Sequence, residues 1–595
     1  MKKKATLVYF IGQTLRRLFR IAKPFFSSEQ KWLARGLLVL LACFSISVSL
    51  LNVLLSYINR DFMTALSLRE KEEFFKQLIF YLIAFAGISP VGVLYRYTEE
   101  RYGLLWRRWL SLHTLEKYFS NRAYYKVGAY EGIDNPDQRI EEDVRNFCGQ
   151  SLSILLILFN SAITITAFAG ILWSISWMLV AAVIFYALIG SASAYYLGKP
   201  LIGLSFQQLR LEADYRYKLV NIRDNAESIA FYGAEGIEKT RTRQRLKRAL
   251  NNLLAIISRN LKLNFFTTNY NYVLQILPTV IVAPLFLNGK IEFGSVLQAG
   301  GAFVAVVNAL SIIVTNFGQL SSLTAIITRL GTFFEALDEA KKVEVGEIFF
   351  QRKTADLVAC QNVTILTPRR DQTVLRNLNL EISSGGLLVT GPSGMGKSTI
   401  LRVLSGLWNC GSGTIITPAR EKSLYLPQRP YMVLGSFRNQ ILYGIKKKGV
   451  SDGSLLAVIN QVGLSESLNR VGGLNSVLDW PNFLSTGEQQ RIAFARLILS
   501  QPEYVFLDEA TTAIDPKTES YLYGLLSRFA KVIVSIGHRS NLSKFHTQVI
   551  ELLGDGNYKL ENIVEVETKQ SASSIPIPSV PRPTPSTPSG GEYDE

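Results

Sequence analysis

Residues 151–198 contain no Asp, Glu, Lys or Arg, and this uncharged stretch limits the possible folds more than any other feature of the chain. An α-helix needs roughly 20 apolar residues to cross the hydrocarbon core of a bilayer. The stretch is about twice that length. Trp173 and Trp177 lie near its centre, on either side of two serines, which is typical of a turn at the membrane interface. Two membrane-spanning helices are therefore predicted here.

Four further uncharged runs predict four more spans. They are residues 36–58, 78–95, 263–289 and 293–328. The hydrophobic share of 48% and the mean hydropathy of +0.17 exceed what a soluble enzyme of 595 residues needs to fill its core. The sequence thus predicts an α-helical membrane domain with six spans in residues 36–330, and the lipid bilayer as one partner.

The segments between these runs differ strongly in positive charge. Those rich in Lys and Arg carry nine, nine and thirteen such residues and are 1–35, 96–150 and 199–262. Those poor in Lys and Arg carry four, none and one and are 59–77, 173–177 and 288–292. Because Lys and Arg remain on the cytoplasmic side, the rich set is predicted to be cytoplasmic, together with the N-terminus and the soluble part of the chain. Charges at helical spacing in 199–262 indicate that the spanning helices continue beyond the bilayer.

Other features of composition define the remaining domains. The net charge of +17 suits this membrane layout, so nucleic acid is not expected as a partner. The four cysteines have no CxxC spacing and indicate neither a disulfide framework nor a zinc site. No cleavable signal is predicted in residues 1–35, because the basic N-terminus lies too far from the first apolar run. A linker is predicted at 331–352, a soluble domain at 353–568 and a disordered tail rich in Pro and Ser at 569–595.

A glycine-rich segment, GPSGMGKST at 391–399, follows an apolar strand pattern and precedes a helical one. It fits the P-loop pattern, in which backbone N–H groups and a helix N-terminus surround the phosphates of a nucleotide. Lys397 is predicted to reach the β- and γ-phosphates, and Ser398 to ligate magnesium. The other residues predicted to bind the nucleotide in this segment are Gly391, Pro392, Ser393, Gly394, Gly396 and Thr399.

A second apolar strand pattern, 504–507, ends in two acids. Asp508 is predicted to hold magnesium through its water shell, and Glu509 to orient and partly deprotonate the attacking water. His538 follows another apolar strand, and we predict that it contacts the γ-phosphate. Gln428 is the remaining candidate for sensing magnesium and the water. ATP and Mg²⁺ are the cofactors that this set predicts.

The stretch LDWPNFLSTGEQQR, at 478–491, lies between the P-loop and the acidic strand. These pieces in this order resemble the ABC transporter superfamily across essentially the whole nucleotide domain. The resemblance implies that Ser485 and Gly487 bind the γ-phosphate held by a second, facing subunit. It also implies that Asp515 belongs to a dimer-contact loop and that Gln428 faces the membrane domain. Since the chain carries the set once, it is predicted to be a homodimeric half-transporter of exporter-type architecture.

Two positions depart from the usual pattern of that superfamily. Thr486 stands where a glycine is usual, although its backbone donor remains, so activity is expected to be kept. The segment TILTPRRDQ, at 364–372, contains no aromatic residue where the superfamily stacks one on adenine. The hypothesis that follows is a weak purine preference, with comparable hydrolysis of ATP and GTP.

Three segments outside the ATP site narrow the resemblance. LNVLLSYINRDFMTAL at 51–66, NPDQRIEEDVRNF at 135–147 and EADYRYKLVNIRDNAESIAFYGAE at 212–235 are similar to subfamily D transporters and to the bacterial group related to SbmA and BacA. The likeness implies that 135–139 and 225–233 transmit motion to the nucleotide domain. It also implies the plasma (inner) membrane of a bacterium and a substrate that is an acyl lipid or acyl-CoA, cobalamin or a peptide.

The uncharged runs themselves say little about the solute. Neutral polar residues suited to line a cavity or to bond neighbouring helices are Asn160, Thr267, Thr268, Asn269, Asn271, Asn308 and Asn316. Residues 59–61, Asn-Arg-Asp, form either an outer gate or an interfacial anchor. The leading interpretation is ATP-driven transport of a small-molecule or lipid-like solute. The alternative is an ATP-gated channel or a regulatory membrane protein, whereas six spans exclude a soluble ATPase acting on nucleic acid.

Overall fold

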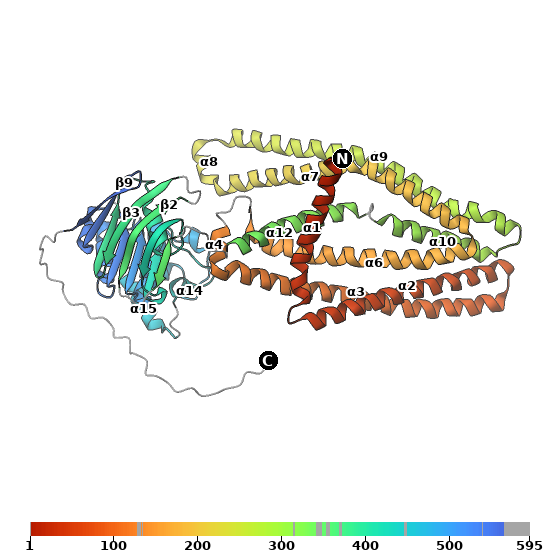
Figure 1. The fold of residues 1–595 in the computed structure, drawn as a ribbon, viewed down its shortest axis with the longest axis horizontal. Helices are drawn as coiled ribbons and strands as arrows, with labels where there is room; N and C mark the ends of the chain where they lie inside the picture. Colours follow the sequence, from red (N-terminus) through yellow and green to blue (C-terminus); the bar gives the residue numbers. More distant parts are fainter. Residues whose placement is uncertain are drawn as a thin grey trace, which may run out of the picture. The chain divides into compact units, whose positions relative to one another are not determined.

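The computed structural model describes residues 2–127, 133, 135–312, 316–340, 348–352, 357–367, 372–445, 449–537 and 539–563. The chain divides into two compact units, Met1–Lys342 and Val343–Glu595. Figure 1 shows that helices make up the first unit and that β-sheets lie at the centre of the second.

Six helices of the first unit are long and apolar enough to cross a membrane, as predicted. They are α2 (Lys31–Leu68), α3 (Lys71–Phe119), α6 (Val144–Ile175), α7 (Trp177–Asp224), α9 (Glu235–Leu287) and α10 (Phe293–Leu310). The other helices described in this unit are α1 (Lys2–Phe26), α4 (Ala123–Val127), α5 (Pro136–Gln138), α8 (Ala226–Tyr232) and α12 (Phe317–Glu339), with a π-helical turn at Arg139–Asp143.

Three of the spanning helices, α3, α7 and α9, are far longer than a bilayer requires, and α7 and α9 follow each other in the chain. Helices α7 and α9 contain 48 and 53 residues, so at about 1.5 Å per residue each exceeds twice the roughly 30 Å hydrocarbon core. They lie side by side and are joined by the short helix α8, forming a limb of the first unit (Figure 1). The length agrees with the prediction that charged helix extends beyond the membrane. Of the two segments implied to transmit motion, residues 225–233 contain α8, and residues 135–139 contain α5 and the start of the π-helical turn.

The predicted turns between spans have clear physical causes. Ser176 has extended backbone angles, and its hydroxyl accepts a hydrogen bond from the Met178 N–H at 3.3 Å, so α6 ends and α7 begins there. Gly289 has φ +69°, the left-handed conformation that glycine adopts without strain, and its N–H donates to the Phe286 carbonyl. Both turns follow the sequence signals.

The sixth span differs from the prediction. The uncharged run 293–328 was expected to be one helix, but α10 ends at Leu310 and α12 begins at Phe317. Helix α10 packs on α2 so closely that a Cβ at Gly294 would lie 1.9 Å from the carbonyl oxygen of Arg60. Helix α12 continues to Glu339, into the segment predicted as a linker at 331–352. Absence of charge shows where a chain can cross lipid, and it does not show where the helix breaks.

The N-terminal helix is held against α12 by charge. Arg17 forms an ion pair with Glu335 at 3.0 Å, and Arg20 forms one with Asp338 at 3.1 Å. On its apolar side, α1 buries Phe25, whose ring stacks on that of Trp106 with centroids 5.8 Å apart. The segment predicted only as a cytoplasmic N-terminus is therefore a packed part of the helical unit.

The second unit contains two sheets. The smaller has the order β1 (Phe349–Arg352), β5 (Gly411–Thr417), β2 (Val358–Leu366), β3 (Thr373–Ile382). The larger has the order β10 (Asn557–Asn562), β9 (Gln548–Gly554), β4 (Gly385–Thr390), β8 (Val532–Ile536), β7 (Tyr504–Asp508), β6 (Ser423–Leu426), and only its β9 and β10 pair antiparallel. Because β4, β8 and β7 run parallel as neighbours, residues at their carboxyl ends gather at one edge.

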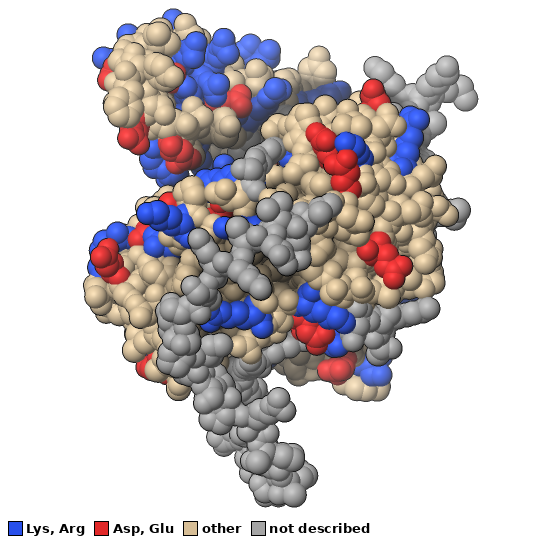
Figure 2. All heavy atoms as spheres, turned by 90° about the vertical axis from the view of Figure 1, so that its left-hand side faces the viewer, with Lys and Arg blue, Asp and Glu red and all other residues tan. Residues whose placement is uncertain are grey.

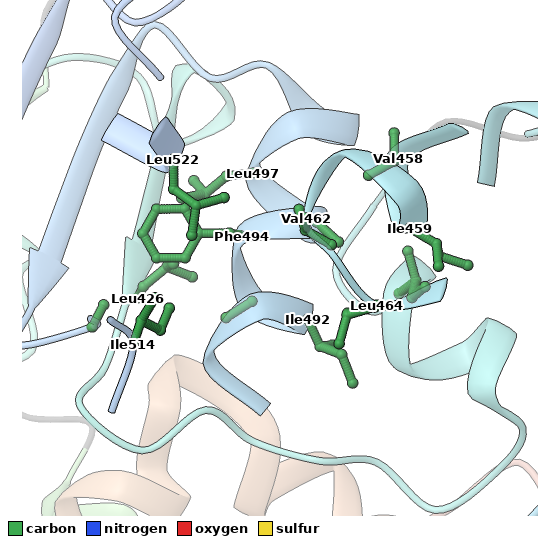
Figure 3. Packing of buried hydrophobic residues seen from close by; sticks show 14 of the residues in the cluster. Leu426, Val458, Ile459, Val462, Leu464, Ile492, Phe494, Leu497, Ile514 and Leu522 are labelled. Atoms are coloured by element: carbon green, nitrogen blue, oxygen red, sulfur yellow. The ribbon is translucent and has the colours of Figure 1, made fainter. Parts of the chain in front are cut away.

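Helices cover this sheet and carry the segments around the nucleotide site. They are α13 (Lys397–Leu404), α14 (Phe437–Leu442), α15 (Asp452–Gln461), α16 (Ser465–Arg470), α17 (Trp480–Phe483), α18 (Thr486–Ser500) and α19 (Pro516–Leu526). Figure 3 shows Phe494 and Leu497 of α18 facing Leu522. It also shows Ile492 of the same helix facing Leu464, which follows α15 in the chain. Since Ile492, Phe494 and Leu497 are fully buried, α18 has a fixed position, and so has the segment at its N-terminus.

The predicted boundary between the linker and the soluble domain differs from the structure. The predicted soluble domain begins at 353, yet β1 already occupies Phe349–Arg352 and pairs with β5. The tail predicted at 569–595 lies outside the described residues. We propose 1–35, 36–330, 331–352 and 353–568 as the limits of the domains. The end of α12 and the whole of β1 lie within the proposed linker, 331–352.

Candidate functional site

The P-loop forms the turn between β4 and α13. Gly391, Gly394 and Gly396 have φ values of +131°, +86° and +87°, which favour glycine at each of these positions. A Cβ at Gly396 would also lie 2.3 Å from Cγ1 of Val374. The Lys397 ammonium is folded over the loop and donates to the carbonyls of Gly391 at 2.8 Å and Pro392 at 3.1 Å. The loop is thus shaped before a phosphate enters it.

The strand topology joins this loop to the acidic strand. The Ser398 hydroxyl donates to the Asp508 carboxylate at 2.9 Å, although the two residues are 110 positions apart. Burial raises the pKa of Asp508, and the hydrogen bond from Ser398 opposes that rise. A hydroxyl and a carboxylate together are oxygen donors of the kind that Mg²⁺ prefers.

The general base predicted from the sequence, Glu509, lies one residue further on. Glu509 has φ +46°, an unusual conformation for a residue with a side chain, and its N–H donates to the Ile536 carbonyl at 3.2 Å. Its carboxylate accepts a hydrogen bond from the Gln428 amide at 2.9 Å. The structure therefore brings together four of the predicted residues: Ser398, Gln428, Asp508 and Glu509. His538 lies outside the described residues.

The segment 484–488 contains Ser485, which caps α18, and the first turn of that helix. Ser485 caps the helix, since its hydroxyl accepts from the Glu488 N–H at 3.3 Å while its own N–H donates to the Glu488 carboxylate at 2.8 Å. Thr486 is exposed, and a Cβ at Gly487 would lie 2.8 Å from the Ala513 carbonyl oxygen. In the described parts of the chain, no hydrogen bond or ion pair joins 484–488 to the P-loop.

Glu488 is the centre of a charge network behind this segment. Its carboxylate also accepts from the Ser467 hydroxyl at 2.5 Å and from the Arg470 guanidinium at 2.7 Å. Partial burial opposes ionisation, but these hydrogen bonds and those from Ser485 outweigh it and lower the pKa of Glu488 from 4.5 to about 2. Because the folded-state pKa is the lower one, the network stabilises the protein above about pH 4.5, and this stabilisation is lost as pH falls toward 2.

Two further predicted features have structural explanations. Asp515 caps α19 and accepts hydrogen bonds from the N–H groups of Lys517 at 3.1 Å and Thr518 at 3.0 Å. Trp480 is 1% exposed, and its indole N–H donates to the Gly435 carbonyl at 2.7 Å. The Asp-Trp pair that precedes the signature segment thus anchors that segment to the domain.

A cavity next to the P-loop includes a residue that sequence reasoning missed. It has a volume of about 650 Å³, and its lining includes Val374, Met395 and Trp408. The Trp408 indole N–H donates to the Leu366 carbonyl at 2.9 Å. This hydrogen bond fixes the ring beside residues 364–372, the segment where the superfamily places an aromatic that stacks on adenine. Trp408 follows α13 in sequence, so only the tertiary fold reveals an aromatic at this place.

A small cavity of about 120 Å³ lies among α2, α3 and α6 of the first unit. Neutral polar groups line it, and the Asn160 amide donates to the Tyr95 hydroxyl at 3.1 Å. By contrast, Thr267 and Asn269 bond to carbonyls of their own helix, at 3.2 and 2.7 Å. Among the candidates for a solute cavity, Asn160 is thus the one that lines this space. Residues 59–61 continue α2, and Arg60 pairs with Asp61 at 2.8 Å.

Comparison with known proteins agrees with this geometry. The family described as ABC transporter transmembrane region 2 matches residues 21–287, and the family described as ABC transporter matches residues 375–512. An uncharacterised ABC transporter ATP-binding protein of Synechocystis is 40% identical, over 90% of this chain and 83% of that protein. The chain belongs to the ABC transporter family.

Two other similarities refine this membership. ABC transporter D family member 2 of Arabidopsis thaliana, a chloroplastic protein, is 36% identical over 92% of this chain and 88% of its own length. The lysosomal cobalamin transporter ABCD4 of Mus musculus is 32% identical over 93% and 96%. A bacterial Atm1-family ABC exporter with ATP bound has the same fold, with a TM-score of 0.70 at 19% identity over 89% of this chain and 94% of that chain. The predicted exporter-type architecture and the resemblance to subfamily D are confirmed, and the protein is an integral membrane ATPase of the ABC transporter family.

Proposed function

We propose that two copies of this chain form a homodimer that uses ATP hydrolysis to move a solute across the plasma (inner) membrane of a bacterium. The N-terminus and the nucleotide domain lie in the cytoplasm. Two observations support the proposal: within the described residues of one chain, no hydrogen bond or ion pair joins 484–488 to the P-loop, and the chain contains each segment once. A second chain can supply Ser485 and Gly487 to the γ-phosphate, with Asp515 near the contact between the chains.

Within each site the residues have distinct tasks. The backbone N–H groups of 391–399 bind the phosphates, and the Lys397 ammonium exchanges its two carbonyl partners for phosphate oxygens. Ser398 and Asp508 would hold magnesium, with Gln428 near it. The ion would neutralise part of the phosphate charge. Glu509 accepts a proton from water as that water bonds to the γ-phosphorus and the bond to ADP breaks. His538 is proposed to contact the γ-phosphate.

Accumulation in sealed vesicles tests the proposal. Reconstituted dimer should concentrate a solute against its gradient only while ATP is hydrolysed, and acyl-CoA, cobalamin and cationic peptides are the classes to compare. The cobalamin class is suggested by the relative ABCD4, which is named as a lysosomal cobalamin transporter. Flux that ATP binding starts but that only follows the gradient would instead identify an ATP-gated channel.

The base-binding cavity yields a prediction about nucleotide choice. The exposed face of an indole can stack on any purine, so ATP and GTP should be hydrolysed at comparable rates. W408L should weaken the binding of both by about 5- to 150-fold, which corresponds to about 1–3 kcal/mol per stacked base. The matched control W32L removes a Trp that is 74% exposed in the first unit and should leave KM unchanged.

Steady-state phosphate release over a range of each nucleotide measures this effect. A strong preference for ATP, or an unchanged KM in W408L, would contradict the assignment of Trp408 to the base.

A further inference from the structure

A cavity lined by cations lies between α7 and α9, in the charged part of the limb. Its lining residues are Lys218, Arg241, Gln244, Arg245 and Arg248, and its volume is about 270 Å³. We call these five residues the basic cavity. Figure 2 shows Lys and Arg gathered on this projecting limb at the top of the view. Neither ATP binding nor the proposed dimer uses them.

Helical geometry explains why these side chains converge. Positions 241, 244, 245 and 248 are spaced by three and four residues, so they lie on one face of α9, and Lys218 faces them from α7. The Arg245 guanidinium donates to the Asp214 carbonyl oxygen at 2.8 Å, which ties that side chain to α7. Arg243 and Lys247 do not line this cavity, and Arg243 lines a separate one with Tyr215 and Ile222 of α7. The cavity is therefore a product of packing between two helices, and not of charge density alone.

Charge in the basic cavity is only partly balanced. Glu238 pairs with Lys218 and, at 3.7 Å, with Arg241. Within the part of the chain that the structure describes, no carboxylate pairs with Arg245 or Arg248. Four cations thus share one acid, and like charges held this close repel each other unless an anion lies among them.

We propose that the basic cavity binds a water-soluble anion that bears phosphate. Arginine presents donors in a planar fork that matches phosphate oxygens, and several cations around one space favour a multiply charged group over a single carboxylate. The volume is several times the roughly 30 Å³ share of one water molecule, which is enough for a phosphoryl group.

The position along α9 separates a soluble anion from a lipid headgroup. Arg248 precedes the uncharged run that starts at residue 263 by fifteen positions, or about 22 Å of helix. That distance exceeds the Debye length of about 8 Å at physiological salt, so headgroup charge is screened there. A bound anion would join α7 to α9 at this level of the limb.

Pyrophosphate is a suitable probe of the site. Binding of labelled pyrophosphate to the full-length dimer in phosphatidylcholine nanodiscs should show a class of sites that R245Q/R248Q weakens by about tenfold or more, since each replaces a charge-assisted hydrogen bond. The matched control R243Q/K247Q removes the same charge from two positions of α9 that do not line the basic cavity and should change the affinity by less than about twofold. Because all these variants keep Lys397, binding at the nucleotide site is common to them and cancels in the comparison.

Three results would overturn the proposal. Equal weakening by both double variants would show a general effect of charge and no site. Binding confined to the nucleotide site, and so lost with K397A alone, would remove the basic cavity from consideration. Displacement of pyrophosphate when phosphatidylglycerol is added to the nanodiscs would identify a lipid headgroup as the ligand. Gln and Arg have similar helix propensities, and an unchanged thermal unfolding curve checks that the fold is retained.

Discussion

Replacing Glu509 by Gln should leave ATP binding near normal and reduce hydrolysis by about 10²- to 10⁴-fold, the usual contribution of a general base. The amide keeps the size of the carboxylate but cannot accept the proton of the attacking water. Glu509 is suited to this role because it follows β7 directly, with φ +46°, and is held by the Gln428 amide at 2.9 Å. Phosphate release in steady state, together with equilibrium binding of ATP, measures the two effects separately.

A second carboxylate near the same strand provides the control. Glu503 precedes β7 and pairs with Lys422 at 3.2 Å. E503Q removes a similar charge from the other end of the strand and should keep hydrolysis near that of the wild type, because an exposed ion pair contributes little. Near-normal turnover in E509Q would refute the role of Glu509 in proton transfer.

Local chemistry explains which parts of the site could be predicted from sequence. The P-loop glycines were predictable because each has positive φ, where most other residues are strained. The identities of Ser398 and Asp508 followed from their motifs, but their 2.9 Å contact depends on the sheet order, which puts β8 between β4 and β7. A motif names the residues, whereas the topology supplies the distance between them.

Other features depend on packing between distant segments. The break between α10 and α12 lies in an uncharged run, and nothing in hydropathy marks it. Trp408 lines the cavity beside the P-loop because the segment after α13 returns to the end of β2, 42 residues earlier in the chain. The capping box of Ser485 and Glu488 is different, since the pattern S-x-x-E is visible in LSTGE and predicts the helix start that the structure contains.

The limb formed by α7, α8 and α9 illustrates the same limit. The run of Arg and Lys at 239–248 is visible in the sequence, and charges at such spacing are typical of a solvated helix face. That interpretation suits Lys247, whose side chain is exposed. It fails for Arg245, because packing against α7 turns this residue toward the Asp214 backbone and into a shared cavity. Which face of a charged helix meets a neighbour cannot be derived from charge spacing.

Two damaged chains should restore each other if the ATP site is shared between subunits. K397A removes the ammonium that would bind the phosphates, and T486E adds a negative charge beside Ser485 and Gly487, where the γ-phosphate of the partner chain is proposed to bind. Each homodimer should lose about 10²-fold or more in hydrolysis, as when a key charge-stabilising group is lost. A mixed dimer has one site with both lesions and one site with neither, so it should recover activity up to the share of one intact site.

T486E is suited to this test because it should not disturb the fold. Thr486 is exposed and is the first residue of α18, where an acidic side chain favours the helix by about 0.3–1 kcal/mol. Mixed dimers can be isolated by sequential purification on two different tags, with K397A/T486E paired with itself as the control that contains no intact site. If one chain formed a complete site from its own P-loop and its own signature segment, each chain of the mixed dimer would still carry a lesion. Hydrolysis would then stay at the level of the two parent homodimers, and the proposed shared site would be wrong.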